Sequence, residues 1–291
     1  MNLHLLRVFV TVVDASSFSR AADQLGISQP ATSKAVKELE NQLDTVLLDR
    51  QGKRFAPSAP GQALYDYGRA IFALEREADE AVKSFYALEQ GRLVIGASTT
   101  IASYWLPPSL LAFHQRHPGI ELSVISANTE QIAELLLDCQ VDVALVEGEV
   151  SDPRIEILSW RSEEMIVAAP RDFADEEAGA HALAQHTWVM RERGSGSRAA
   201  AQRILDEYRI RPAQVIEVGS NEAIVQSVAA GIGLGLVPRI CARDQLALGR
   251  IRKHAIGAGP CMRQLYRMRL PRRPVSQPAL AFEALLASRT A

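Results

Sequence analysis

The sequence has little of what marks a secreted, membrane-bound or disulfide-stabilised protein. It holds only three cysteines in 291 residues, and they lie far apart. No apolar run approaches the roughly 18 residues that a membrane span needs, and the N-terminus lacks the basic segment, apolar core and cleavage site of a signal peptide. Because an odd set of distant cysteines is typical of reducing compartments, we expect a cytoplasmic protein with no membrane contact.

A strong charge of one sign and the usual signatures of catalysis are missing too. The net charge of −2 gives no general attraction to nucleic acid, so any contact with DNA must be local. His114 and His117 are three residues apart with no third metal ligand nearby, and no nucleophile–base arrangement can be named. Residues 194–198 (GSGSR) are not a phosphate loop, because no Gly-Lys-Ser/Thr follows them. We therefore predict no metal, no cofactor and no catalytic residue.

What the sequence does contain is a pattern of three short helices within residues 1–60. Residues 18–25 form the second helix, and Gly26 closes it where a left-handed residue is wanted. Ser28 is placed to cap the third helix, with Pro30 in its first turn, where a missing N–H costs little. Helix, tight turn and helix at this spacing is the helix-turn-helix pattern.

The third helix is two-sided. At about 100° per residue, small and apolar side chains fall on one side, namely Ala31, Thr32, Ala35, Val36, Leu39 and Leu43. The other side carries residue types that contact base edges and phosphates in DNA. The predicted DNA-binding residues are Ser28, Gln29, Pro30, Ser33, Lys34 and Lys37 on this helix, with Arg50, Lys53 and Arg54 on a basic turn after it.

A small helical domain with a solvated basic face is the alternative interpretation. Residues 1–60 hold seven Lys/Arg against six Asp/Glu, so charge alone does not decide between the two. The capped helix, its two distinct faces and the basic turn occur together, and this combination favours DNA binding.

Residues 1–61 resemble the winged helix-turn-helix of LysR-type transcriptional regulators. The resemblance implies that Gln29, Pro30, Ser33 and Lys34 meet bases or nearby phosphates, and that the basic turn is the wing. The matching residues are Leu6, Phe9, Phe18, Ala21, Ala22, Leu25, Ser28, Gln29, Pro30, Ala31, Ser33, Leu39, Glu40, Leu43, Leu47, Arg50 and Gly61. Four positions depart from the pattern, where Leu48, Pro57, Ser58 and Pro60 replace the usual Phe, Leu, Thr and Ala.

Residues 61–90 form a predicted linker helix with a heptad seam. Apolar and small residues alternate three and four apart, namely Leu64, Tyr67, Ile71, Leu74, Ala78, Ala81, Phe85 and Leu88. One narrow seam on a long helix needs a partner, and the family resemblance implies self-pairing in a dimer. The alternative is a helix that lies on its own domain.

Residues 91–291 alternate strands with helices, which predicts an α/β fold with a parallel sheet covered on both faces. We expect two similar lobes, residues 91–161 with 266–291 and residues 162–265. The region resembles the effector-binding domain of the same family, which is similar in fold to periplasmic binding proteins. The predicted architecture is thus a winged helix-turn-helix in residues 1–60, a linker helix and a two-lobed effector domain.

Ligands of open α/β sheets lie beyond the carboxyl ends of strands, where hydroxyls and free N–H groups at helix starts bind anions. Helix capping is the alternative role for such hydroxyls. Glu147 would repel an anion unless protonated or paired with Arg, and would suit an amine-bearing ligand. The predicted effector-binding residues are Ser98, Thr99, Thr100, Asn128, Glu147, Arg193, Ser195 and Ser197, with Ser220 and Asn221 as weaker candidates.

We therefore predict a sequence-specific DNA-binding transcriptional regulator, not an enzyme, controlled by a small anion or carboxylate bound between the lobes. Its predicted partners are double-stranded DNA, the small effector and further copies of itself, as a homodimer through residues 61–88 and a homotetramer. The alternative is a small-molecule-binding α/β protein, or an enzyme, whose helical N-terminal domain does not bind DNA.

Overall fold

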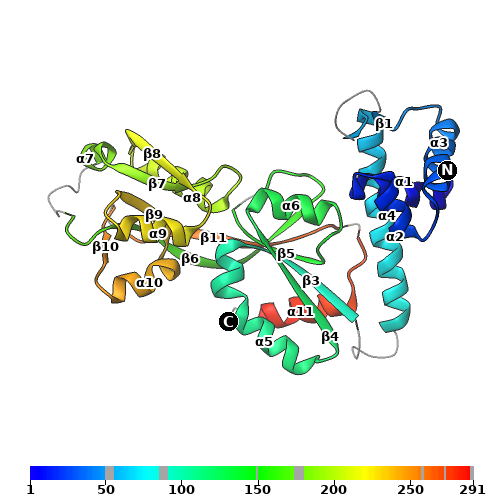
Figure 1. Cartoon of the computed structure of the whole chain (residues 1–291). Helices are drawn as coiled ribbons and strands as arrows, with labels where there is room; N and C mark the ends of the chain where they lie inside the picture. The colour runs from blue at the N-terminus through cyan, green and yellow to red at the C-terminus, as the bar shows by residue number, and fades with distance from the viewer. Residues whose placement is uncertain are drawn as a thin grey trace. The chain divides into compact units, whose positions relative to one another are not determined.

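The computed structural model describes residues 1–49, 56–84, 91–148, 150–173, 180–256, 259–271 and 273–288. The chain divides into two units, residues 1–83 and 84–291 (Figure 1). None of the helices within the described ranges is long and apolar enough to cross a membrane.

The N-terminal unit begins with three helices, α1 (Leu3–Ala15), α2 (Phe18–Leu25) and α3 (Gln29–Gln42). The predicted caps are confirmed, because Ser28 Oγ accepts from the N–H of Ala31 at 3.3 Å and Gly26 takes φ 66°. Leu6, Phe9 and Ala21 are fully buried where these helices meet. The hydrophobic pattern thus folds the first 42 residues around one small core.

The buried stripe of α3 is narrower than predicted. Thr32, Val36 and Leu39 are fully buried, as the helical periodicity indicated. Ala31 is exposed, and so is Leu43, which follows the last helical residue. The buried positions follow one row along the helix, four and three residues apart, so side chains at the edges of the predicted arc stay outside.

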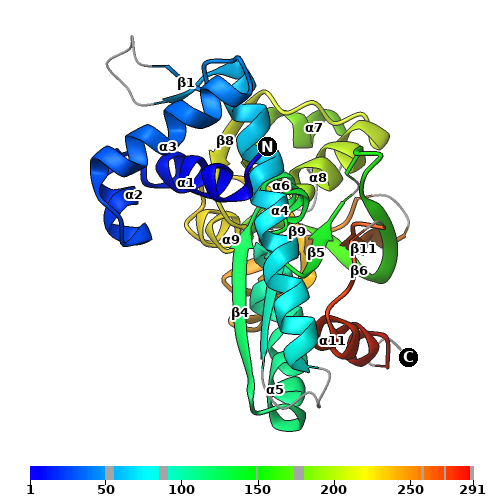
Figure 2. The ribbon, with the colours of Figure 1, turned by 90° about the vertical axis from the view of Figure 1, so that its right-hand side faces the viewer.

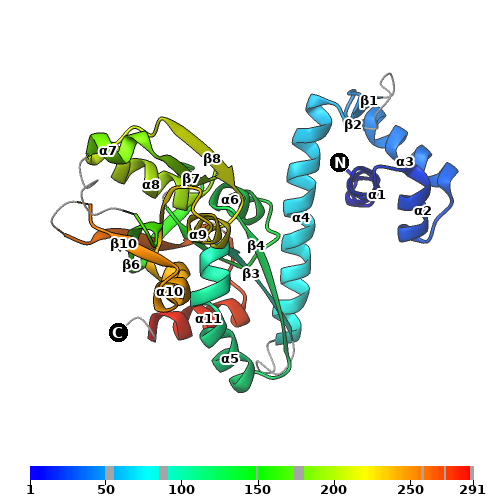
Figure 3. The same ribbon diagram turned by 60° about the vertical axis from the view of Figure 1, so that its left-hand side comes forward.

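A short two-stranded sheet connects α3 to the next helix. Strands β1 (Leu48–Asp49) and β2 (Ala56–Pro57) pair antiparallel, with Leu48 opposite Pro57 (Figure 3). Leu48 is buried in the core, and the Ser58 hydroxyl donates to the carbonyl of Val46 at 2.6 Å. Three of the residues that depart from the family pattern therefore fit this turn. The predicted wing residues Arg50, Lys53 and Arg54 lie outside the described residues.

Helix α4 (Ala59–Ser84) is one continuous helix of 26 residues and starts two residues earlier than predicted (Figure 2). Its first half packs on α1. A Cβ added at Gly68 would lie 2.6 Å from Val10 Cγ2, and the hydroxyl of Tyr65 donates to the Asp14 carboxylate at 2.5 Å. Burial, followed by this hydrogen bond, raises the pKa of Tyr65 to about 12.

The predicted heptad seam of α4 divides into two parts. Leu64 and Ile71 pack against the core of the N-terminal unit, as the single-domain alternative required. Tyr67 and Leu74, seven residues apart, are 73% and 47% exposed. The seam residues Phe85 and Leu88 are outside the described part of the chain. An apolar row therefore remains on the outer side of this helix.

The second unit is built on one nine-stranded sheet, with strand order β4-β3-β5-β11-β6-β9-β7-β8 and β10 paired to β6. Its strands are β3 (Gly91–Ser98), β4 (Ile120–Ala127), β5 (Val143–Glu147), β6 (Glu156–Pro170), β7 (Thr187–Arg191), β8 (Gln214–Val218), β9 (Leu234–Pro238), β10 (Ile251–His254) and β11 (Cys261–Arg269). Strand β3 runs parallel to β4 and β5, and β7 runs parallel to β8 and β9, as predicted.

Helices cover both faces of each half of this sheet. In the first half, Phe113 and Phe282 pack on one face and Ile132 on the other. In the second half, Leu205 packs on one face and Ile224 on the other. The helices are η1 (Ile101–Trp105, a π-helical turn), α5 (Pro107–Arg116), α6 (Thr129–Leu137), α7 (Ala180–Gln185), α8 (Gly196–Glu207), α9 (Asn221–Ala229), α10 (Arg239–Ala247) and α11 (Gln277–Ser288).

Two long antiparallel strands, β6 and β11, run through the middle of the sheet and join its halves. Their register shifts between Leu265 and Tyr266, and Arg161 lies opposite Leu265. The lobe boundaries that we predicted, between residues 161 and 162 and between 265 and 266, lie within these two strands.

The two halves also touch where β5 ends and α8 begins. Thr129 Oγ1 donates to the carbonyl of Glu147 at 3.1 Å and accepts from the N–H of Gly196 at 3.2 Å. A Cβ added at Gly196 would lie 1.2 Å from the Glu147 carbonyl oxygen. Only a glycine allows this close approach of two backbones.

We expect Gly196→Ala to lower the free energy of unfolding by about 3 kcal/mol or more, because backbone atoms must move to admit the methyl group. Gly219→Ala is the matched control, since Gly219 also follows a strand and precedes a helix but has nothing within 4 Å of an added Cβ. Calorimetry of the full chain should show a change within about 0.5 kcal/mol for this control. Equal losses in both variants would contradict the close contact.

Candidate functional site

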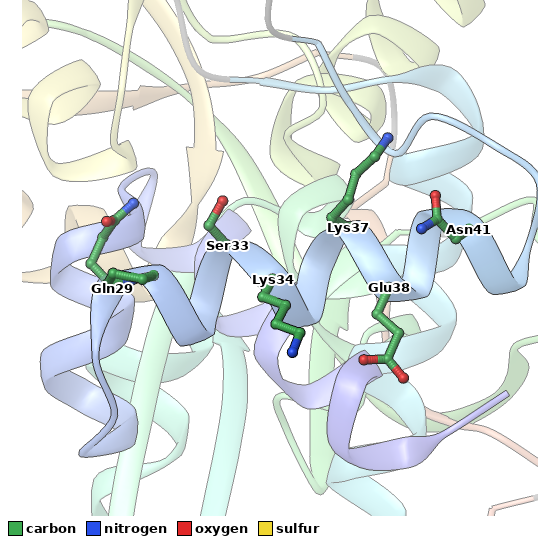
Figure 4. Close-up of a pocket in the computed structure, with 7 residues that line it drawn as sticks. Gln29, Ser33, Lys34, Lys37, Glu38 and Asn41 are labelled. Carbon is green, nitrogen blue, oxygen red and sulfur yellow. The ribbon is translucent and has the colours of Figure 1, made fainter.

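The outer face of α3 presents polar and basic side chains. Gln29, Lys34 and Lys37 are exposed and Ser33 is partly exposed. Gln29, Ser33, Lys37 and Asn41 point to one side of the helix, whereas Lys34 points to another (Figure 4). With Pro30 and Glu38 they line one concave surface. The structure therefore brings together five of the six residues predicted on this helix, and the sixth, Ser28, caps its start.

Two residues of this surface, Glu38 and Asn41, were missing from the prediction. The signal was available, because Ser33, Lys37 and Asn41 follow one another at intervals of four along the helix. An amide can bind a base edge or a phosphate, as Gln29 can. Glu38 places a carboxylate beside Lys34, so the surface is less basic than the prediction assumed.

The start of α3 also has the electrostatics of an anion site. The helix dipole favours negative charge at this end, although Ser28 already caps the N–H of Ala31 and Pro30 has no N–H. Lys34 and Lys37 add positive charge along the same helix, while Gln29 and Ser33 offer hydrogen bonds. Phosphates can therefore be held beside groups that bind base edges.

A buried carboxylate fixes this helix to the strand that follows it. Glu40 is 4% exposed, and its Oε1 accepts from the N–H groups of Leu47 at 3.0 Å and Leu48 at 3.4 Å. Its Oε2 lies 3.7 Å from the ammonium of Lys37. From the sequence, Glu40 stood out only through the family resemblance, because the local pattern does not indicate which amides it binds.

The second predicted site lies between the halves of the large sheet. Asn221 Nδ2, at the start of α9, donates to Thr100 Oγ1 at 2.7 Å and to Ser197 Oγ at 2.9 Å. These three residues come from three different helix starts and are at most 1% exposed. The structure therefore brings Thr100 and Ser197 together, and Asn221 proves to be their shared partner.

Arg263 of β11 extends this hydrogen-bonded group. Its Nη1 donates to Ser197 Oγ at 2.7 Å, and its Nε donates to Glu163 Oε1 at 2.7 Å. Its Nη2 lies 2.5 Å from the same oxygen of Glu163 and 3.5 Å from Glu147 Oε1. Trp105 Nε1 donates to the other oxygen of Glu163 at 3.0 Å. We call Thr100, Glu147, Glu163, Ser197, Asn221 and Arg263 the interlobe cluster.

Other predicted effector residues have partners of their own. Thr99 Oγ1 accepts from Arg191 Nη1 at 3.0 Å, and Arg191 also pairs with Glu192. Asn128 and Ser195 cap α6 and α8, which was the alternative role for them. The last two predicted residues differ in burial. Ser98 is 1% exposed, whereas Arg193 is exposed.

The local pattern indicated little of the interlobe cluster's charged part. Arg263 and Glu163 lie directly opposite each other in the β6–β11 register and are 100 residues apart in sequence. No single position stood out, because both strands carry other charged residues, namely Glu156, Arg161 and Glu164 on β6 and Arg267 and Arg269 on β11. Pairing those strands was needed to identify the ion pair.

Metal and thiol chemistry has little support in the described ranges. They contain no group of three or more His, Cys, Asp or Glu residues able to hold a metal ion. Cys139, Cys241 and Cys261 form no disulfide within the described residues, and burial raises the pKa of the Cys241 thiol.

Comparison with known proteins identifies both parts of the chain. Residues 3–62 match the model of the bacterial regulatory helix-turn-helix protein, lysR family, and residues 87–291 match the LysR substrate binding domain. The chain belongs to the LysR family of DNA-binding transcriptional regulators, with an N-terminal helix-turn-helix and a C-terminal effector-binding domain.

Individual relatives span most or all of the chain. The RuBisCO operon transcriptional regulator of Allochromatium vinosum is 32% identical over 294 residues, covering 100% of this chain and 97% of that protein. Full-length CbnR complexed with its target DNA has the same fold, with a TM-score of 0.70, 22% identity and 100% coverage of both chains. The CcmR regulatory domain of Synechocystis PCC6803, in complex with 2-PG, covers 69% of this chain and 98% of that chain (TM-score 0.63, 29% identity).

We expect Glu40→Ala to lower the free energy of unfolding of the N-terminal unit by about 1–3 kcal/mol, because two buried N–H groups lose their acceptor. Glu40→Gln keeps an amide oxygen and should cost less. Calorimetry of the full chain tests this, with exposed Glu38→Ala as the control. Equal stability of Glu40→Ala and Glu38→Ala would show that the carboxylate does not anchor α3.

Proposed function

We propose that this chain reads its DNA site through the outer face of α3. The observation that carries the proposal is the two-sidedness of the helix. Gln29, Lys34 and Lys37 are exposed, whereas Thr32 and Val36 on the other side are fully buried. Gln29 and Ser33 contact base edges in the major groove, and Lys34 and Lys37 hold phosphates. Ser28 and Pro30 set the helix start, and Arg50, Lys53 and Arg54 contact the backbone or minor groove.

We further propose that a small effector binds between the halves of the large sheet and sets the regulator's activity. Thr100, Ser197 and Asn221 support this, because three helix starts converge there from both halves. A small anion or carboxylate is the effector class that such helix starts favour. A ligand that binds one arrangement of the halves more tightly shifts the equilibrium towards that arrangement. This change alters how the DNA-binding units are placed on DNA. The 2-PG complex of CcmR supports a small-molecule site in domains of this kind.

We propose that the chain works as a homodimer through α4, and as a homotetramer of such dimers, in the cytoplasm where its DNA is. The exposed apolar row with Tyr67 and Leu74 supports the dimer, because a large apolar side chain every seven residues is the pattern of a helix seam. Two copies present two recognition helices to two half-sites. Nothing in this scheme requires a catalytic step.

Gln29→Ala combined with Lys34→Ala should weaken specific DNA binding about 100-fold or more, because each good base or phosphate contact contributes about 1–3 kcal/mol. Fluorescence anisotropy with a DNA site selected for the wild-type chain, at one fixed salt concentration, measures the affinity. Gln202→Ala combined with Arg203→Ala is the matched control, since it removes the same kinds of group from exposed positions on α8. Specific binding that survives the first double change would refute the proposed recognition face.

Leu74→Glu should raise the dimer dissociation constant at least about tenfold, since it places a charge in an apolar seam. Sedimentation equilibrium of the full chain measures the constant. Arg76→Glu is the control, because it reverses the charge of an exposed α4 residue outside the predicted seam. A dimer unchanged by Leu74→Glu would place the interface elsewhere.

A further inference from the structure

The interlobe cluster holds one carboxylate more than Arg263 can satisfy. Glu147, Glu163 and Arg263 are 2%, 5% and 3% exposed, so each is withdrawn from water. Arg263 contacts Glu163 at 2.7 Å through Nε and 2.5 Å through Nη2, and reaches Glu147 only at 3.5 Å. Arg263 therefore pairs closely with Glu163 and only at a longer distance with Glu147.

Other cations nearby are engaged with different groups. The Arg191 guanidinium pairs with Glu192 and Thr99. The Arg161 guanidinium lies 4.5 Å and 4.8 Å from the ring centres of Trp105 and Trp160. Burial lowers its pKa, and the charge of Glu163 acts against that shift. The Arg191 guanidinium is not an ion-pair partner of Glu147 within the described residues.

Three buried atoms of the cluster make no hydrogen bond with the residues that the structure describes: two acceptors, Glu147 Oε1 and Asn221 Oδ1, and one donor, Arg263 Nη2. This donor lies 2.5 Å from Glu163 and 3.5 Å from Glu147. The Ser98 hydroxyl makes no hydrogen bond with the described residues either. Buried polar atoms are almost always paired in proteins, and a buried carboxylate most of all. One guanidinium neutralises only one of the two buried carboxylates, and it lies closer to Glu163. A second positively charged donor, from outside this chain, is therefore expected at Glu147.

We infer that the effector presents a protonated amine to Glu147. An ammonium group offers three N–H donors and a positive charge. The charge suits the under-paired carboxylate of Glu147, and a further N–H suits the second acceptor of the same cluster, Asn221 Oδ1. The inference rests on the proposed interlobe effector site and narrows its ligand. An amine-bearing carboxylic acid satisfies both Glu147 and the helix starts, whereas a simple anion satisfies only the latter.

The first test needs no ligand. In thermal unfolding of the full chain, Glu147→Gln should leave Tm unchanged or raise it by a few degrees, because it removes a poorly paired buried charge. Glu163→Gln is the matched control and should lower Tm, because the buried Arg263 guanidinium loses its closest negative charge. If Glu147→Gln lowers Tm as much as Glu163→Gln, then Glu147 is a structural partner of Arg263 and the inference fails.

The second test compares sets of three related compounds at equal millimolar concentration, each set being an amino acid, its deaminated acid and its decarboxylated amine. We expect an amine-bearing compound to raise the Tm of the wild-type chain by at least about 2 °C and to lose this effect in Glu147→Gln. No Glu147-dependent shift from any amine, or equal shifts from the deaminated acids in both proteins, overturns the inference.

The variant Thr100→Ala separates this inference from the proposed site itself. Shifts caused by deaminated acids alone, and lost in Thr100→Ala, would leave an interlobe effector site but show that it does not need an amine. Shifts that persist in both Thr100→Ala and Glu147→Gln would place the ligand elsewhere, and both proposals would fall.

Discussion

The pairing of a buried guanidinium with a buried carboxylate, Arg263 with Glu163, is the constraint on which the C-terminal domain depends. The two residues face each other on β11 and β6, the only strands shared by both halves of the sheet in the described chain. Removing one partner of such a pair lowers the free energy of unfolding by about 3–5 kcal/mol, because the other is left as an uncompensated buried charge. The pair therefore fixes the register of the connecting strands, and it holds Arg263 where Ser197 and Asn221 can join it.

This arrangement explains how one fold can both bind a ligand and transmit its presence. Thr100 belongs to the first half of the domain, while Ser197 and Asn221 belong to the second. Groups that bridge two bodies respond to any ligand that competes with or completes their contacts, so binding free energy becomes a change in the equilibrium between arrangements. In the N-terminal unit, Glu40 has a comparable role, because a single buried carboxylate sets the path from α3 into β1.

Local patterns were enough to predict the parts of the molecule that depend on neighbours in sequence. The caps at Ser28 and Gly26, the buried row of α3 and the alternation of strands with helices are all decided within a few residues. Arg263 and Glu163 could not be paired in this way, since 100 residues separate them and their contact follows from strand order. The positions of the apolar row on α4 were predicted, but its division between the N-terminal core and an exposed face was not. Packing on α1, through Gly68, takes part of it into the core.

The most direct test of the account is a selection of binding sites from random double-stranded DNA by the full-length chain. Two recognition helices carried by a homodimer require two half-sites related by twofold symmetry, with their centres a whole number of helical turns apart at about 10–10.5 base pairs per turn. Enrichment of such paired sites is the predicted result. Enrichment of no sequence, or of single half-sites without a fixed partner, would contradict the account of a dimeric DNA-binding regulator.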